Sequence, residues 1–226
     1  MKYFPVTIVD NFYENPDLIR EFALSLEYHR SDDGRWPGSR TSLISMLNRS
    51  FFNTFTNKLF SLFFDFNHND LDWNIDTNFQ KINKFSSDIN DIKNSGWIHS
   101  DEGLFSGIVY LNPDDCFYSG TSIYKLKSGE VDNCQQKTKY LHYTHSKEFD
   151  ENEYKIEKEY NNGKYVETIR IENVYNRLVI FEGGVHHGVP TFYSENDEPR
   201  LTQVFFVNNL STSSDFPIIR SRLSNV

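Results

Sequence analysis

The sequence has little cysteine and no excess of positive charge. Its 226 residues include two cysteines, Cys116 and Cys134, which is too few for a disulfide framework. Two reduced thiols are typical of a cytosolic protein, so we expect a cytoplasmic location. Lys and Arg number 23 against 32 Asp and Glu, and the net charge of −9 disfavours binding to the phosphates of nucleic acid.

Long apolar runs are also missing. The longest, around residues 60–64, is far shorter than the ~18 residues that a membrane span needs, so we expect no membrane segment. Residues 6–9 have the pattern of a short strand and do not resemble the apolar part of a signal peptide. We find no internal repeat and no linker, and we therefore predict one domain over residues 1–226.

The order of the expected elements indicates a mainly β protein with flanking α-helices. One helical pattern begins at Asn15-Pro16, and a second covers residues 50–63. Runs typical of strands occupy residues 6–9, 73–79, 106–111, 120–124, 176–181 and 201–207. Short strands separated by turn signals indicate a sandwich or barrel, and helices that precede most strands indicate that they pack on one face of it.

One stretch, at about residues 128–172, is polar and densely charged. Its mixed charge runs, such as residues 155–159, are typical of a solvated face, so we interpret the stretch as a polar insertion at the rim of the domain. The alternative is a lid or a substrate-contact element beside a pocket.

Two motifs offer candidate metal ligands. His99 and Asp101 are two residues apart, and on an extended backbone their side chains point to the same side. His186 and His187 follow the predicted strand 176–181 after two glycines, and either could supply a second imidazole. Two imidazoles and one carboxylate form the facial triad that binds Fe(II) and leaves positions open. The alternative is a surface His–Asp pair with histidines that merely cap a turn.

A third motif offers an anion-binding group. Arg200 begins an apolar strand after His187, and Thr202 faces the same side of that strand. A guanidinium binds a carboxylate through two parallel hydrogen bonds, and the Thr202 hydroxyl could donate to the same group. The alternative is a solvent-facing Arg200 that balances the acidic residues among 195–198.

Taken in order, these motifs resemble the 2-oxoglutarate and Fe(II)-dependent dioxygenases, and most closely their prolyl-4-hydroxylase-like branch and the small phage-type families. The segments WIHSDEGLFSGIVYLNP, SGTSIY and NRLVIFEGGVHHGVP are similar to the family's HxD, GGT and distal-histidine segments. NFYENPDLIREFALSLEYH and RWPGSRT resemble the N-terminal part of the phage-type members. The resemblance implies a double-stranded β-helix, a cupin-like jelly roll with helices on one side.

The resemblance also implies roles for individual residues. His99, Asp101 and His187 would be the catalytic iron ligands. His187 is preferred to His186 because the family's ligand usually precedes a small residue and a valine, as in His187-Gly188-Val189. Arg200 would bind the distal carboxylate of the cosubstrate 2-oxoglutarate, with a weaker case for Thr202.

The implied activity is hydroxylation of a peptide side chain or a small metabolite, with release of succinate and CO2. The loop of residues 35–40 could line the entrance of the pocket. Two other interpretations stay open: a jelly-roll binding module without turnover, and a cupin-like metal enzyme without 2-oxoglutarate, in which His142 and His145 would be extra ligands. The substrate, the oligomeric state and the bound metal are not predicted.

Overall fold

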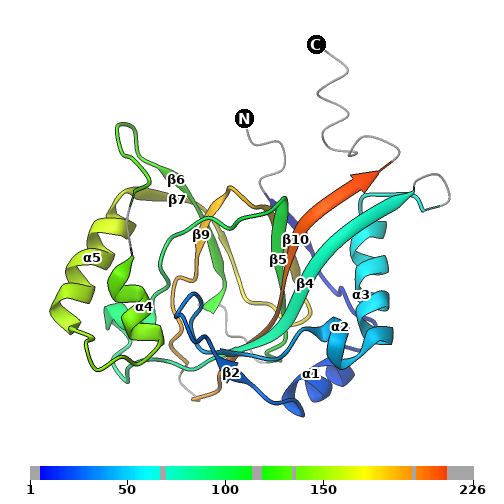
Figure 1. Cartoon of the computed structure of the whole chain (residues 1–226), viewed down its shortest axis with the longest axis horizontal. Coiled ribbons are helices and arrows are strands. Elements are labelled where there is room, and N and C mark those ends of the chain that lie inside the picture. The colour runs from blue at the N-terminus through cyan, green and yellow to red at the C-terminus, as the bar shows by residue number, and fades with distance from the viewer. Residues whose placement is uncertain (1–5, 67–69, 114–118, 134–135, 195–196, 213–226) are drawn as a thin grey trace.

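Helices occur in two groups along the chain. The computed structural model describes residues 6–66, 70–113, 119–133, 136–194 and 197–212, and both cysteines lie outside these residues. The first group is α1 (Pro16–Leu24), α2 (Ile44–Leu47) and α3 (Arg49–Ser61). The second group, α4 (Lys137–Tyr143) and α5 (Glu151–Gly163), follows a short 3-10 helix, η1 (Ile92–Asn94). The two helix groups lie at opposite ends of the molecule (Figure 1).

The strands form two antiparallel sheets between these groups. They are β1 (Val6–Val9), β2 (His29–Arg30), β3 (Ser39–Arg40), β4 (Leu71–Ile82), β5 (Phe105–Tyr110), β6 (Thr121–Leu126), β7 (Tyr165–Ile171), β8 (Leu178–Glu182), β9 (His186–Gly188) and β10 (Arg200–Thr212). The larger sheet has the order β1-β8-β5-β10-β4-β3-β2, and the smaller has the order β7-β6-β9. This arrangement is a double-stranded β-helix, so the predicted fold class is confirmed.

The central strand β10 contributes side chains to both faces of the larger sheet. It pairs with β4 and β5, and its side chains alternate between the two faces. Leu201, Phe205 and Val207 pack on the side of the helices α1 and α3. Arg200 and Val204 point to the opposite face, where they line a cavity. One strand therefore carries both core residues and site residues.

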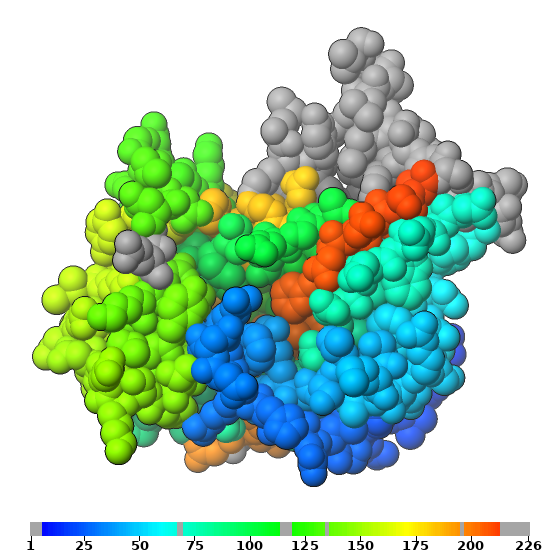
Figure 2. Space-filling model, viewed as in Figure 1, coloured from blue at the N-terminus to red at the C-terminus, as the bar shows by residue number. Residues whose placement is uncertain are grey.

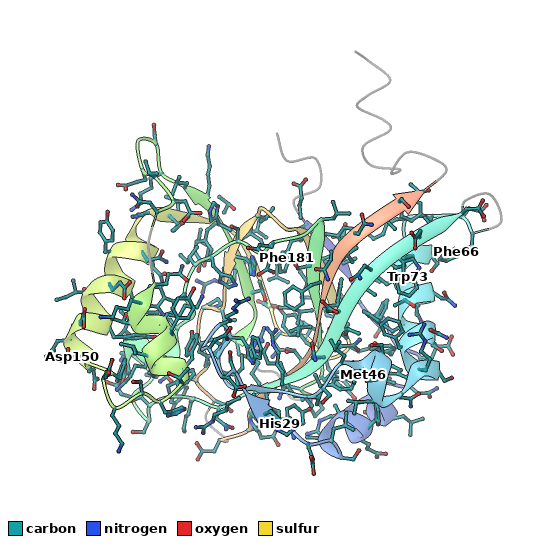
Figure 3. All side chains as sticks on the ribbon, in the orientation of Figure 1. His29, Met46, Phe66, Trp73, Asp150 and Phe181 are labelled. Carbon is teal, nitrogen blue, oxygen red and sulfur yellow. The ribbon has the colours of Figure 1, made fainter. Side chains whose placement is uncertain are left out.

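Strand β4 shows the alternation that is predicted for residues 73–79, because its alternate side chains pack on the side of the helices. Trp73, labelled in Figure 3, has its ring centroid 5.5 Å from that of Phe60 in α3, and Phe79 lies in the same core. A second core lies between the two sheets and includes Tyr110 and Ile123. Phe181, also labelled in Figure 3, belongs to this second core. The site is thus built against a sheet that is packed on both faces.

The polar stretch of about residues 128–172 contains α4, α5 and β7. One face of α5 is exposed to solvent, as predicted for this stretch, since Ile156 and Tyr160 are mostly exposed. The opposite face of α5 is buried through Tyr154 and Lys158. A third apolar cluster joins Tyr154 to Trp97, two residues before His99. The stretch is therefore part of the packed domain on its inner side. In the described part of the chain, we find no helix with the length and apolar character of a membrane span.

Candidate metal centre and its cavity

Three predicted ligands converge in the structure. His99 Nε2 lies 3.6 Å from Asp101 Oδ1, and His187 Nε2 lies 3.6 Å from Asp101 Oδ2. One ligand atom from each of the three residues falls within 4.8 Å of the others. Two imidazole nitrogens and a carboxylate oxygen on one side of a common point are the donor set of a facial metal triad.

Hydrogen bonds fix which imidazole nitrogen faces this point. His99 Nδ1 lies 2.9 Å from the Trp97 carbonyl oxygen, and His187 Nδ1 lies 3.0 Å from the Val185 carbonyl oxygen. A carbonyl only accepts, so each Nδ1 carries the proton and donates it. Each Nε2 is then left with a free lone pair, which is the state that a metal ligand requires.

Burial and neighbouring charges favour the ligand-ready protonation states. Burial lowers the pKa of His99 well below its ordinary value, and the nearby His187 and Lys139 lower it further. Burial alone would raise the pKa of Asp101, but the neighbouring His187 and His99, together with Ser106 and Arg40, outweigh it and hold this pKa below its ordinary value. A neutral imidazole beside an ionised carboxylate is prepared to bind a cation.

Backbone contacts hold the two ligand segments together. His99 and His187 form an isolated antiparallel bridge, with N–H···O distances of 3.0 and 2.8 Å. The Asp101 N–H donates to the Gly183 carbonyl at 3.0 Å. Gly183 has no room for a side chain, because a Cβ there would lie 2.4 Å from the Gly103 carbonyl oxygen. Gly183, the first of the two glycines before the distal histidine, thus allows the two loops to touch.

Helix α5 positions the first ligand segment. Asn162 accepts from the Ile98 N–H at 3.0 Å and donates to the Gly96 carbonyl at 3.0 Å. Asn161 donates to the Ile98 carbonyl at 3.0 Å, and Lys158 donates to the Ser95 and Ile92 carbonyls. The segment before His99 therefore satisfies its backbone groups on side chains of the charged stretch, for which the sequence predicts a position at the rim.

We expect Asn162→Ala to weaken metal binding about 10- to 100-fold, as removal of groups that orient metal ligands typically does. The substitution leaves the Ile98 N–H and the Gly96 carbonyl without their side-chain partner, so the ligand segment loses its fixed position. The measurement is titration of the metal-free protein with Zn(II), well below the unfolding temperature. Asn152→Ala, on the exposed face of the same helix, is the matched control. Lower stability with unchanged Zn(II) affinity would contradict the positioning role.

Arg200 and Thr202 lie on the inner face of β10, as predicted. Arg200 is 4% exposed, which excludes the alternative of a solvent-facing charge pair. Its Nε donates to the Ser119 carbonyl at 2.6 Å, and its guanidinium lies 5.3 Å from the ring centroid of Tyr110. Arg200 Nη2 and Thr202 Oγ1 are buried and have no hydrogen-bond partner among the described residues. Unpaired buried donors of this kind are costly, so they indicate a missing acceptor group.

The other predicted histidines do not reach the triad. His186 points to the smaller sheet, where its Nε2 lies 2.9 Å from Asp132 Oδ2 and its ring packs on Tyr165. His142 lies among aromatic rings, with centroid distances of 4.8 Å to both Phe85 and Tyr154. Within the described residues, neither His142 nor His145 joins the metal-ligating group. The proposed extra ligands of the cupin-like alternative are therefore absent from the site.

The buried His142 predicts a pH-dependent stability. Burial, reinforced by the charge of Lys158, lowers the pKa of His142 to about 4, whereas an unfolded histidine has a pKa near 6.5. The unfolded chain binds the extra proton between these values, so the unfolding free energy falls as the pH drops through this window. We expect the unfolding free energy of His142→Phe, taken relative to that of the wild type, to be about 2 kcal/mol higher at about pH 5 than at neutral pH.

Urea unfolding at the two pH values measures this difference, in which the contributions of other groups cancel. The same substitution at the exposed His29, labelled in Figure 3, is the matched control. An equal pH dependence in the wild type and His142→Phe would contradict the account.

The triad and Arg200 share one cavity of about 810 Å³. Its walls come from the inner faces of both sheets, from α4, and from the loop between β2 and β3. This loop touches α4, since a Cβ at Gly34 would lie 2.5 Å from the Tyr140 carbonyl oxygen. In Figure 2 the blue loop lies against the green α4 at the edge of the hollow. The predicted role of residues 35–40 at the entrance agrees with this position, and Arg35, Trp36, Pro37 and Arg40 line the cavity.

Comparisons with known proteins agree with the fold. Residues 2–202 match the model of a family of unknown function, DUF6445. No curated protein matches the chain. The crystal structure of HygX from Streptomyces hygroscopicus with nickel and 2-oxoglutarate bound is 9% identical, with a TM-score of 0.54, over 90% of this chain and 82% of that chain.

Two further HygX structures give similar values. The complex with nickel, 2-oxoglutarate and hygromycin B has the same TM-score of 0.54, identity of 9% and coverage of 90% and 82%. The apo protein has a TM-score of 0.50 and 9% identity over 90% of this chain and 81% of that chain. At this identity the likeness establishes a shared fold.

Proposed function

This chain belongs to the family DUF6445, and we propose that it is an Fe(II)- and 2-oxoglutarate-dependent oxygenase. The observation that carries the proposal is the convergence of His99, Asp101 and His187 in the cavity that also contains Arg200, whose buried Nη2 has no hydrogen-bond partner among the described residues. Two imidazoles and one carboxylate suit a divalent transition metal with open positions. The chemistry of the donor set therefore fits Fe(II).

The unpaired donors fit the cosubstrate. Arg200 Nη2 and Thr202 Oγ1 are both buried on one face of β10, and a carboxylate is the acceptor that would satisfy them together. Tyr110 lies beside Arg200 and donates from its hydroxyl to Thr121 Oγ1 at 2.7 Å, which fixes the ring that packs on the guanidinium. Two of the HygX structures contain nickel and 2-oxoglutarate, and their fold supports the same interpretation.

Each group of residues has a separate task in this mechanism. His99, Asp101 and His187 hold the metal, and Arg200 with Thr202 binds and orients the distal carboxylate of 2-oxoglutarate. Phe181, whose ring centroid lies 4.3 Å from that of His187, and Val204 exclude water from the cavity wall. When bound, the metal and 2-oxoglutarate supply the oxidising chemistry with dioxygen, and the products are succinate and CO2.

The finer assignments rest on the sequence resemblance. Hydroxylation of a peptide side chain or a small metabolite, and membership of the prolyl-4-hydroxylase-like or phage-type branch, stay predictions. HygX, crystallised with hygromycin B, is an example of this fold with a small molecule bound. That example favours a small molecule over a macromolecule as the substrate of this chain.

Succinate formation tests the proposal. The protein is mixed with Fe(II) and 2-oxoglutarate without oxygen, and succinate is measured before and after air is admitted. We expect succinate only after air is admitted, even without the substrate, at a slow uncoupled rate. Binding of 2-oxoglutarate without any succinate would favour the non-catalytic jelly-roll module.

A further inference from the structure

A second cationic side chain faces the cavity from β3, next to the loop between β2 and β3. Arg40 ends β3, where its backbone pairs with Gln80 of β4. Its guanidinium lies 4.6 Å from the ring centroid of Trp36 and 5.3 Å from that of Phe206, and all three side chains line the cavity. Aromatic faces attract a guanidinium but satisfy none of its hydrogen bonds.

Two neighbouring donors are left without acceptors here. Arg40 Nε and Trp36 Nε1 are both buried and have no hydrogen-bond partner among the described residues. A guanidinium and an indole N–H only donate hydrogen bonds. Their burial away from water is therefore favourable only when a group with hydrogen-bond acceptors binds beside them. The pair therefore indicates the chemistry of a ligand: it must present oxygen acceptors.

The charge of Arg40 is also unbalanced. No carboxylate of the described residues forms an ion pair with it. Asp101 attracts it from a distance, and burial outweighs this attraction and lowers the pKa of Arg40 to about 10. The Asp101 oxygens already face His99 and His187, so they are committed to the metal centre.

The loop that leads into β3 and Arg40 is fixed before any ligand binds. Gln80 Nε2 donates to the Pro37 carbonyl at 2.9 Å. Gly38 has a φ of +69° and lies so close to β4 that a Cβ would come within 2.1 Å of the Lys81 carbonyl oxygen. A preorganised donor pair loses little entropy when an anion binds. Lys139 of α4, which lines the same cavity, adds positive charge from another wall.

We propose that Arg40 and Trp36 form the substrate-recognition site of this cavity and that the substrate is a small molecule with an anionic group, a carboxylate or a phosphate. This inference rests on the proposed function, since it assigns Arg200 to 2-oxoglutarate and Arg40 to the molecule that is oxidised. The anion would lie against the Arg40 guanidinium and the Trp36 indole N–H, in the cavity that the metal ligands also line.

Binding of simple probes tests this assignment. The protein is loaded with Zn(II) and saturated with 2-oxoglutarate, so that the Arg200 end is filled, and the probes are benzoate, phenyl phosphate and the neutral benzamide. We expect one of the anions to bind at least about tenfold more tightly than benzamide. The anion that binds more tightly shows whether the recognised group of the substrate is a carboxylate or a phosphate.

Variants then locate the binding. Arg40→Met should remove the preference for the anion, Arg40→Lys should keep part of it, and Arg170→Met, a matched change at an exposed arginine paired with Glu167, should keep all of it. All three should bind 2-oxoglutarate as the wild type does. Equal binding of anions and benzamide to the wild type, or an unchanged preference in Arg40→Met, would overturn the inference. Loss of 2-oxoglutarate binding by the wild type would instead refute the proposed function.

Discussion

We expect His187→Ala to lower the affinity for Fe(II) or Zn(II) by more than about 100-fold, while His186→Ala keeps it. Loss of a direct ligand should exceed the 10- to 100-fold effect typical of the groups that orient ligands. The two histidines are neighbours in β9, but their side chains point to opposite sides. His187 Nε2 faces Asp101, whereas His186 Nε2 lies 2.9 Å from Oδ2 of Asp132, in the segment between β6 and α4.

The two variants serve as controls for each other. Both remove one imidazole from the same strand, so a general loss of folding would affect them alike. Metal affinity is measured by titration under anaerobic conditions, with thermal unfolding recorded for each variant. Retention of metal by His187→Ala together with its loss in His186→Ala would reverse the ligand assignment.

We expect Arg200→Met to weaken 2-oxoglutarate binding at least about 30-fold, because truncation of one partner of a buried charge pair costs about 2–5 kcal/mol. Burial of Arg200 is nearly complete, and the variant leaves the distal carboxylate without its counter-charge. Metal affinity should be unchanged, since Arg200 contacts none of the three ligands in the described structure. The measurement is calorimetric titration of 2-oxoglutarate into the Zn(II)-loaded variant.

Two further variants distinguish a specific role from a structural one. Arg200→Lys keeps the charge but loses the planar fork of donors, so we expect an intermediate affinity. Arg177→Met removes an arginine that pairs with Asp10 at the surface, away from the cavity, and serves as the matched control. An unchanged affinity in Arg200→Met would exclude Arg200 from 2-oxoglutarate binding.

The sequence predicted the part of the site that depends on strand geometry. His99 and Asp101 lie on one side of the chain because an extended backbone brings residues i and i+2 to the same side. Arg200 and Thr202 share a face of β10 for the same reason. The jelly roll was predictable from the number of short apolar strands and from the resemblance. Local periodicity is therefore enough to place side chains on a face.

Contacts between distant segments were not predictable in this way. The carboxamides of Asn161 and Asn162 hold the backbone before His99, yet a charged helix shows no periodic sign of a buried polar contact. The signal that was present is the pair of asparagines directly before Gly163, at the end of a helix. Arg40 was predictable only as part of a possible entrance loop, because the lack of a hydrogen-bond partner for its Nε in the described structure is a property of the folded chain.

Calorimetric titration of 2-oxoglutarate into the wild-type protein, with and without bound Zn(II), tests the central claim most directly. The account predicts one binding site per chain that requires the metal, since the triad and Arg200 face the same cavity. Absence of binding, or equal binding by metal-free and metal-loaded protein, would contradict it.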